Sequence, residues 1–377
     1  MAINLRSPYY QGTIVANTAY TTLDVSIWDG SVTSPVTAQY NLRKSVIGSG
    51  IEVYFEISEL VRDYLDVNFD GDYNGQAVWV QTVTTAYDSS GTIIYNSTSA
   101  PQLALDGYWY FEESQTATPS ALISNRELFV LADNLFRIPI FSAGSPTILF
   151  IKDNEIVYSQ SFVPEDDSSD QIKYVSINGD FANYDTFKER VTESNGTYED
   201  NSCIQSFFNS YSIGAVDKIT VSDSNGIETI KVNVIEECKY EPKKITFINK
   251  FGALQDMYFF KKSVENMTVD RESYKANTLS VYGQYSKSNH VNRDFNVIGK
   301  ESISLSSGFL SEEYNEVFKQ LMLSEKVWVT NLLETGEQVF PINVKTSDIT
   351  YKTSLNNKLV EYTIEFDKSF DTINNIR

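Results

Sequence analysis

Histidine, the commonest general base, and cysteine, which with histidine supplies most zinc ligands, are almost missing from this sequence. The 377 residues include one histidine, His290, and two cysteines, Cys203 and Cys238. A structural zinc site needs further ligands and a secreted disulfide scaffold needs more cysteines, so both classes are excluded. We interpret the two thiols as small buried residues, with a bridge formed between them after cell lysis as the alternative.

Long apolar runs are missing too. No stretch of about 18 apolar residues occurs, which argues against a transmembrane helix. The N-terminus also lacks the basic and apolar segments of a signal peptide. We therefore expect synthesis in a cytoplasm and no membrane insertion.

Basic residues are scarce and unevenly placed. Residues 1–240 contain 13 Lys and Arg against 32 Asp and Glu, whereas residues 241–377 contain 17 against 18. Binding to nucleic acid needs basic patches, so we expect no nucleic-acid partner. The asymmetry suggests an acidic, solvated front and a near-neutral rear that packs against other protein. An acidic surface with no further meaning is the alternative.

Recognised catalytic motifs are missing as well. The sequence has no G-x-S-x-G elbow, G-x-G-x-x-G turn, P-loop or H-E-x-x-H helix. His290 lies in the polar segment SKSNHVNRD, so we predict an exposed loop residue rather than a catalytic one. A carboxylate pair for glycoside hydrolysis is defined by geometry and stays open. We predict no catalytic residue and no cofactor.

One segment does match a binding pattern. In DVNFDGDYNG, residues 66–75, a calcium loop of the EF-hand type would place Gly71 at its obligatory turn. The glutamate that should close such a loop is replaced by Ala77, and a strand follows where a helix should. We therefore predict a polar connector with weak candidate metal ligands only, namely Asp66, Asn68, Asp70 and Asp72.

Beta signals dominate what is present. Residues 76–98 predict a hairpin with Ser89, Ser90 and Gly91 in its turn, and residues 217–235 predict another around Asn225-Gly226. Residues 243–263 predict two strands with Gly252 at the bend. The C-terminal segments 348–355 and 358–367 predict further strands, and in the latter Val360, Tyr362, Ile364 and Phe366 face a core.

Apolar spacing predicts two helices. The first covers residues 57–65, with Ile57, Leu60, Val61, Tyr64 and Leu65 on one face. The second covers residues 311–326, with Ser311 as N-cap and an apolar stripe of Tyr314, Val317, Phe318, Leu321 and Met322. Residues 184–193 suggest a third helix.

These patterns predict a mainly β, multi-domain protein with β-sandwich-like or barrel-like domains and two or three short helices. We place the domains at residues 1–115, 116–240 and 241–377. Tyr108, Trp109, Tyr110 and Phe111 would alternate across a strand, which fits a protein interface or a sugar-stacking surface. A strand buried between two domains is the alternative.

Several segments resemble structural proteins of tailed phages that infect Bacteroidota. They include INLRSPYY near the start, FEISELVRDYLDVNFDG, CKYEPKKITFINKFGALQDMYFFKKS, and the ending from LMLSEKVWV to DTINNI. The matches are short, are spread over most of the chain and contain no catalytic motif. The resemblance implies a tail or baseplate protein in several copies.

We accordingly expect a non-enzymatic virion component, synthesised in the bacterial cytoplasm, that binds other tail proteins and further copies of itself. One alternative is an adhesin that binds host-surface glycans through exposed aromatic residues such as Trp109. Another is a carbohydrate-active enzyme carried on the virion.

Overall fold

The computed structural model describes most of the chain. The described residues are 2–35, 37–46, 52–73, 76–113, 117–131, 135–142, 145–162, 169, 171–178, 216–224, 226–235, 237, 239–333, 336–351 and 359–373. They confirm the predicted fold class, because the protein is mainly β, contains several sheets and has only short helices. Cys203, Cys238 and the predicted helix at 184–193 lie outside the described residues.

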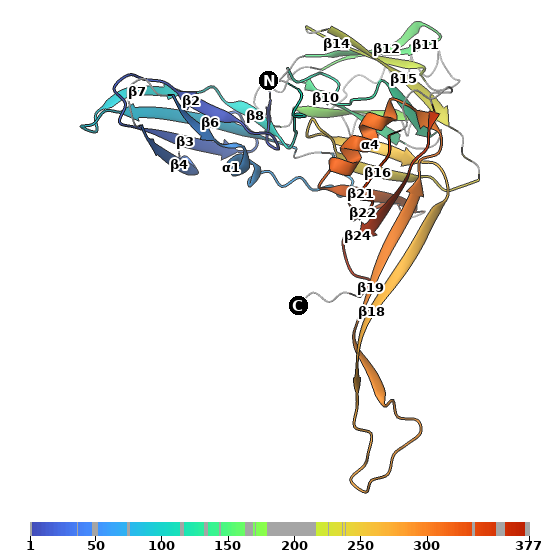
Figure 1. Ribbon diagram of the computed structural model, residues 1–377. Coiled ribbons are helices and arrows are strands. Elements are labelled where there is room, and N and C mark those ends of the chain that lie inside the picture. Colours follow the sequence, from blue (N-terminus) through green and yellow to red (C-terminus); the bar gives the residue numbers. More distant parts are fainter. Residues whose placement is uncertain are drawn as a thin grey trace.

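The N-terminal region is a layered pair of sheets that projects from the rest of the molecule (Figure 1). Its larger sheet has the order β1-β8-β6-β3-β4, with β7 paired to β6. These strands are β1 (Ile3–Asn4), β3 (Tyr20–Trp28), β4 (Tyr40–Ser45), β6 (Ala77–Tyr87), β7 (Ile93–Thr98) and β8 (Gln102–Leu105). The smaller sheet pairs β2 (Tyr10–Thr13) with β5 (Val53–Glu56), and α1 (Ser58–Arg62) follows it.

The middle region contains two sheets. A five-stranded sheet has the order β12-β11-β14-β15-β9, in which only the β15–β9 pair is parallel. Its strands are β9 (Glu127–Leu131), β11 (Thr147–Lys152), β12 (Glu155–Ser161), β14 (Lys218–Asp223) and β15 (Gly226–Ile235). The second sheet pairs β10 (Leu135–Phe141) with β13 (Ile172–Asn178).

The C-terminal region is a seven-stranded sheet of order β17-β16-β21-β22-β24-β19-β18. Its strands are β16 (Lys243–Ile248), β17 (Leu254–Phe259), β18 (Ser263–Lys275), β19 (Asn292–Ser306), β21 (Val327–Leu333), β22 (Gly336–Val344) and β24 (Thr363–Lys368). A short pair, β20 (Leu310–Ser311) and β23 (Leu359–Val360), lies beside it. Helix α4 (Tyr314–Leu323) buries its apolar stripe in the same core as this sheet.

Two cores hold these parts together. One core cluster combines apolar residues of the middle sheets with those of α4 and the C-terminal sheet. The other combines the N-terminal sheets with Phe141, Tyr174, Leu254 and Trp328, which come from the middle and C-terminal regions. Each core therefore crosses at least one of the boundaries between residues 1–115, 116–240 and 241–377.

Several predicted elements are confirmed. Strands β6 and β7 form the hairpin expected at 76–98, and Gly91 in its turn has φ +84°. Strands β16 and β17 form the expected hairpin, with Gly252 at φ +79°. The alternation at the C-terminus is also right, since Val360, Tyr362, Ile364 and Phe366 are all buried.

Other predicted elements need correction. Helix α1 is only five residues long and leaves Tyr64 exposed, because the chain leaves the helix at Asp63. Helix α4 begins later than predicted, and Ser311 is not its N-cap, because Ser311 pairs with Leu359 in the β20–β23 ladder. Residues 348–351 are not a strand. Neither described helix has the length and apolar character that a membrane span requires.

Candidate functional site

The segment that resembled a calcium loop connects the N-terminal sheet to the C-terminal body. From Asp66 to Asp70 its side chains alternate, with Val67 and Phe69 buried and the polar residues exposed. An extended chain sends successive side chains to opposite sides. The acidic half of the pattern therefore faces solvent, and the apolar half faces the body.

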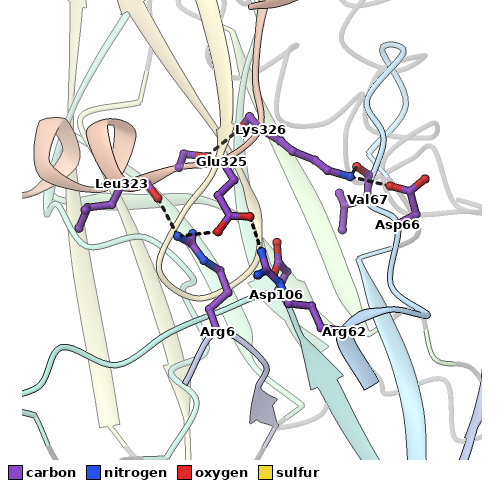
Figure 2. Close-up of polar contacts among 9 residues, drawn as sticks. Arg6, Arg62, Asp66, Val67, Asp106, Leu323, Glu325 and Lys326 are labelled. Atoms are coloured by element: carbon purple, nitrogen blue, oxygen red, sulfur yellow. Dashed lines mark hydrogen bonds and ion pairs between the residues drawn. The ribbon is translucent and has the colours of Figure 1, made fainter. Parts of the chain in front are cut away.

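The four weak metal candidates lie along this exposed side. Asp66 accepts a hydrogen bond from the Lys326 Nζ at 2.6 Å, and Lys326 also donates to the Val67 carbonyl at 2.7 Å (Figure 2). The hydrogen bond and charge of Lys326 lower the pKa of Asp66. Asp70 accepts the backbone N–H of Asp72 at 3.2 Å.

Asn68, the fourth candidate, is exposed. Ala77, at the position where a calcium loop has its closing glutamate, is the first residue of β6. Within the described part of the chain, no three His, Cys, Asp or Glu side chains form a group that could hold a metal ion. Weak calcium binding at this loop stays a prediction.

The apolar half of the segment anchors the N-terminal sheet. The ring centroid of Phe69 lies 4.8 Å from that of Tyr73 and 5.7 Å from that of Trp328 in β21. The Tyr73 hydroxyl donates to the Asp256 Oδ1 in β17 at 2.6 Å. Desolvation, followed by the charge of Asp256, raises the pKa of Tyr73, so this hydroxyl keeps its proton and stays a donor.

Asp256 connects all three regions of the chain. Its side chain is almost completely buried, with only 2% of the residue exposed. It accepts hydrogen bonds from Tyr73, from the Thr246 hydroxyl at 2.8 Å and from the backbone N–H of Arg137 in β10 at 3.2 Å. The Arg137 guanidinium lies 4.2 Å from the Tyr73 ring centroid. A buried carboxylate is tolerated only when it is hydrogen-bonded in this way.

A second polar network crosses the same junction nearer the surface (Figure 2). Glu325, which follows α4, forms two ion pairs through its carboxylate. The Arg62 Nη2 lies 2.5 Å from one oxygen, and the Arg6 Nη2 lies 3.4 Å from the other. Arg62 also pairs with Asp106 at 2.9 Å, and Arg6 donates to the Leu323 carbonyl at 2.8 Å. Burial raises the pKa of Asp106 despite the neighbouring Arg62. The network joins β1, α1 and the end of β8 to the C-terminus of α4.

The aromatic segment after β8 belongs to this junction too. The backbone N–H of Tyr108 donates to the Lys250 carbonyl at 2.7 Å. The Tyr110 hydroxyl donates to Glu316 of α4 at 2.7 Å, and the Lys319 ammonium lies 3.4 Å from the Tyr110 ring centroid. Tyr110 therefore contacts α4 across the junction.

The predicted strand at residues 108–111 is wrong. These residues form an irregular connection. The backbone N–H of Tyr108 bonds to a turn of the body, and those of Trp109 and Tyr110 bond to the side chains of Ser7 and Glu113 instead of to a neighbouring strand. Tyr108 is buried and Trp109 is partly buried, so Trp109 is no open platform for a sugar ring. Phe111 alone in this segment is fully exposed.

The feature that the sequence did not indicate is a long arm formed by β18 and β19 (Figure 1). The two strands pair from Ser263 and Leu305 at the body to Lys275 and Asn292 near the tip. Strand β24 pairs with β19 only over Ser302–Ser306. In the described part of the chain, the outer half of the arm therefore has no strand neighbour on either edge.

Solvent surrounds the arm. Every residue of β18 after Ser263 is exposed, and so are the first five residues of β19. The loop between the strands is held by its own backbone hydrogen bonds, among them Ser280 N–H to the Gln284 carbonyl at 2.8 Å. His290 lies in this exposed tip, where its carbonyl accepts the Arg293 Nε at 3.4 Å.

Large apolar side chains gather at the tip. Val281 is 98% exposed, Tyr282 is 89% exposed and Tyr285 is 71% exposed, and Leu279 is largely exposed as well. Other large apolar side chains, such as Phe111 and Ile227, are exposed elsewhere on the chain. The four at the tip lie together in one loop, and such a cluster is typical of an interaction site. The tip is therefore the strongest candidate for a binding surface.

A solvent-open hollow of about 970 Å³ lies beside the base of the arm. It is lined by residues of β18, β19, β22 and β24 and by the segment 369–373. Its lysines include Lys345, which pairs with Glu365 at 2.9 Å, and Lys368, which pairs with Glu301. Both of these ammonium groups are thus already paired with carboxylates of the sheet itself.

No known protein-family model matches the sequence, and no curated protein matches it either. The functional assignment therefore depends on the junction and the arm.

Proposed function

We propose that this chain is a non-enzymatic structural protein of a phage virion, a tail or baseplate component present in several copies. The observation that carries the proposal is the projecting arm with its exposed apolar tip. The resemblance of several segments to structural proteins of tailed phages supports the same assignment.

The arm supports an assembly role because its outer strand edges are unpaired within the described chain. A two-stranded ribbon is at best marginally stable in water, and unpaired strand edges invite pairing with another chain. Among the described residues, the outer part of the arm is held by contacts between its own two strands, such as the Tyr274 and Phe295 rings with centroids 5.7 Å apart. Burial against a neighbouring protein would complete it.

The junction supports the proposal in a different way. Asp256 and Glu325 tie the N-terminal sheet to the body through charge-assisted hydrogen bonds, which fix direction better than apolar contacts do. The N-terminal sheet and the arm are thereby held at a set angle to one another. A component that positions its neighbours in a particle needs this kind of fixed geometry.

An adhesin is the second candidate, and the tip favours it more than Trp109 does. Tyr282 and Tyr285 are exposed aromatic rings of the type that stacks on sugars. A glycan array would show selective binding that is lost in Tyr282→Ala if this candidate is right. Degradation of host capsular polysaccharide by the purified protein would instead favour a virion-borne enzyme.

The proposal is tested on purified particles. Quantitative mass spectrometry of virions should find this protein in several copies per particle, and gold-labelled antibodies should locate it on the tail. Particles that lack the protein, although infected cells contain it, would rule out the structural role.

A further inference from the structure

We infer that the arm tip of one copy binds the acidic N-terminal sheet region of a second copy. The tip is defined as residues 274–293 and the acceptor as the surface formed by residues 2–113. This inference deepens the proposed function, on which it rests for the presence of several copies, by naming the two surfaces that join them.

The tip has a charge opposite to that of the chain. Residues 274–293 include Lys275, Lys287 and Arg293 and no acidic residue, so their net charge is +3. The whole chain has a net charge of −20. The tip thus combines three cations with exposed Tyr282 and Tyr285, a composition that suits an acidic surface with apolar or aromatic patches.

The acceptor has the complementary charge. Residues 2–113 contain 13 Asp and Glu and 4 Lys and Arg, a net of −9. All four cations make contacts within the chain: Arg6 and Arg62 with Glu325, Lys44 with the Tyr54 carbonyl, and Arg43 with the Tyr20 ring. Among the ion pairs between described residues, lysines of the body pair with only two of the 13 carboxylates, Lys326 with Asp66 and Lys250 with Glu113, so negative charge remains in excess at this surface.

The acidic residues are densest from α1 to the start of β6. Glu59, Asp63, Asp70 and Asp72 are all exposed there. Tyr64 lies among them with 46% of its surface exposed, and its ring contacts that of Tyr40 edge to face. The surface thus offers both anions and an aromatic face to the tip.

The same charges argue against other pairings. Two identical tips in contact would place six cations together, so a symmetric contact between tips is disfavoured. Contact with the acceptor of the same chain is opposed by geometry, because the arm and the N-terminal sheet leave the body in different directions (Figure 1). The 13 residues of β18 hold the tip about 40 Å along the arm. Head-to-tail contact between copies remains, and such contacts build rings or filaments.

Charge reversal in the full chain tests this inference. Sedimentation velocity should show salt-sensitive self-association of the unaltered protein. A tip variant with Lys275→Glu, Lys287→Glu and Arg293→Glu should weaken it roughly tenfold or more, since steering and docking both depend on complementary charge. The matched control reverses three exposed lysines outside the tip, Lys239, Lys262 and Lys300, and should associate like the unaltered protein.

An acceptor variant makes the test specific. Glu59→Lys, Asp63→Lys and Asp70→Lys should weaken self-association as strongly as the tip variant does. A mixture of the tip and acceptor variants should associate again, because the unaltered tip of the acceptor variant then meets the unaltered acceptor of the tip variant. An acceptor variant that associates normally would overturn the inference in favour of contact between tips.

Photocrosslinking locates the contact. A photoreactive phenylalanine analogue at position 282 should crosslink to residues within 2–113 of another chain in a mixture of isotopically light and heavy protein. Crosslinks confined to one chain, to another tip or to a different protein would overturn the inference, as would a protein that stays monomeric. If particles contain the protein but charge reversal at the tip does not change self-association, this inference fails and the proposed function survives. If the protein associates through its tip but is absent from particles, the proposed function fails and the tip contact survives.

Discussion

The Tyr73 hydroxyl and the Asp256 carboxylate form the polar centre of the junction. Asp256 is buried and receives three hydrogen bonds, from three different regions of the chain. Loss of one donor leaves a buried charge partly unsatisfied, which costs more than the net value of an ordinary hydrogen bond. Single residues at this point therefore have effects on the whole molecule.

Replacement of Tyr73 by Phe should destabilise the protein by about 1–3 kcal/mol, because the bond to charged Asp256 is lost while the ring is kept. Urea unfolding followed by fluorescence measures this. The control is Asn68→Ala in the same segment, an exposed position that should change the free energy of unfolding by about 0.5 kcal/mol or less. Equal effects of the two changes would show that the Tyr73 hydroxyl adds nothing.

Calcium should bind the segment 66–75 weakly or not at all. Asp66 is already paired with Lys326, and the exposed side chains follow an extended chain instead of surrounding a point. Sensor-type loops reach dissociation constants of about 10⁻⁷–10⁻⁵ M only with a full ligand set. Isothermal calorimetry at millimolar calcium checks this, and a micromolar constant that disappears in Asp70→Asn would refute it.

At the scale of elements, the turn between β16 and β17 is pressed against the end of β8. A Cβ on Gly252 would lie 2.8 Å from the backbone nitrogens of Asp106 and Gly107. The turn also needs its positive φ of +79°. The hairpin from the C-terminal sheet can therefore meet the N-terminal sheet only with glycine at this position.

Gly252→Ala should consequently cost more than Gly91→Ala. Both glycines have nearly the same φ, but nothing lies within 4 Å of a Cβ at Gly91. Backbone strain of about 1–2 kcal/mol is common to both, and close approach should add about 1–3 kcal/mol at Gly252 alone. The difference between the urea unfolding midpoints of the two variants measures the cost of close approach at Gly252. Equal midpoints would mean that the backbone at the junction moves to accept the methyl group without loss of stability.

Helix α4 should be part of the core and not a free binding helix. Phe318 is fully buried, with its ring centroid 4.7 Å from that of Tyr362 and 6.3 Å from that of Phe259. Phe318→Ala should cost about 3–5 kcal/mol. Leu323→Ala, at an exposed position of the same helix, should cost about 0.5 kcal/mol or less. Thermal melts compare the two variants. Small and equal changes in melting temperature would indicate that the apolar stripe of α4 packs against a partner protein instead of the core of its own chain.

Elements with one apolar side were predictable from the sequence, and elements without one were not. The stripe of α4 and the alternation around Ile364 follow from burial on one side, which leaves a period in the sequence. Strand β18 and the outer part of β19 are exposed on both faces, so polar and apolar residues mix and no period marks them. Their length comes from pairing between distant residues, such as Val264 and Ser304.

The candidate site was harder still, because its contacts join residues far apart in the chain. Arg62 and Glu325 are 263 positions apart, and neither belongs to a motif. In the segment 66–73 the acidic residues suggested an ion site, whereas the buried Val67 and Phe69 decide what the segment does. Whether the polar or the apolar residues of an alternating segment determine its role depends on the surface against which the segment packs. That surface is formed by residues far away in the sequence, so the segment alone does not reveal it.

At the scale of the whole molecule, the N-terminal sheets depend on the rest of the chain. Their core cluster includes Ile248, Leu254 and Trp328 of the C-terminal sheet. Strand β1 and the segment after α1 lie at the junction, where Arg6 and Phe69 make their contacts. Without the body, these apolar surfaces would face water.

The fragment 2–113 should therefore not fold alone. Exposure of one large apolar side chain costs about 1.5–3 kcal/mol, and a domain of this size has only about 5–15 kcal/mol of total stability. Near-UV circular dichroism and proton–nitrogen NMR should show no fixed packing and no cooperative unfolding. The control is the full chain with residues 276–291 replaced by Asn-Gly, which should melt like the unaltered protein because the tip contacts no core. A fragment with dispersed amide signals and a sharp melt would show instead that residues 2–113 are an independent domain that docks on the body afterwards.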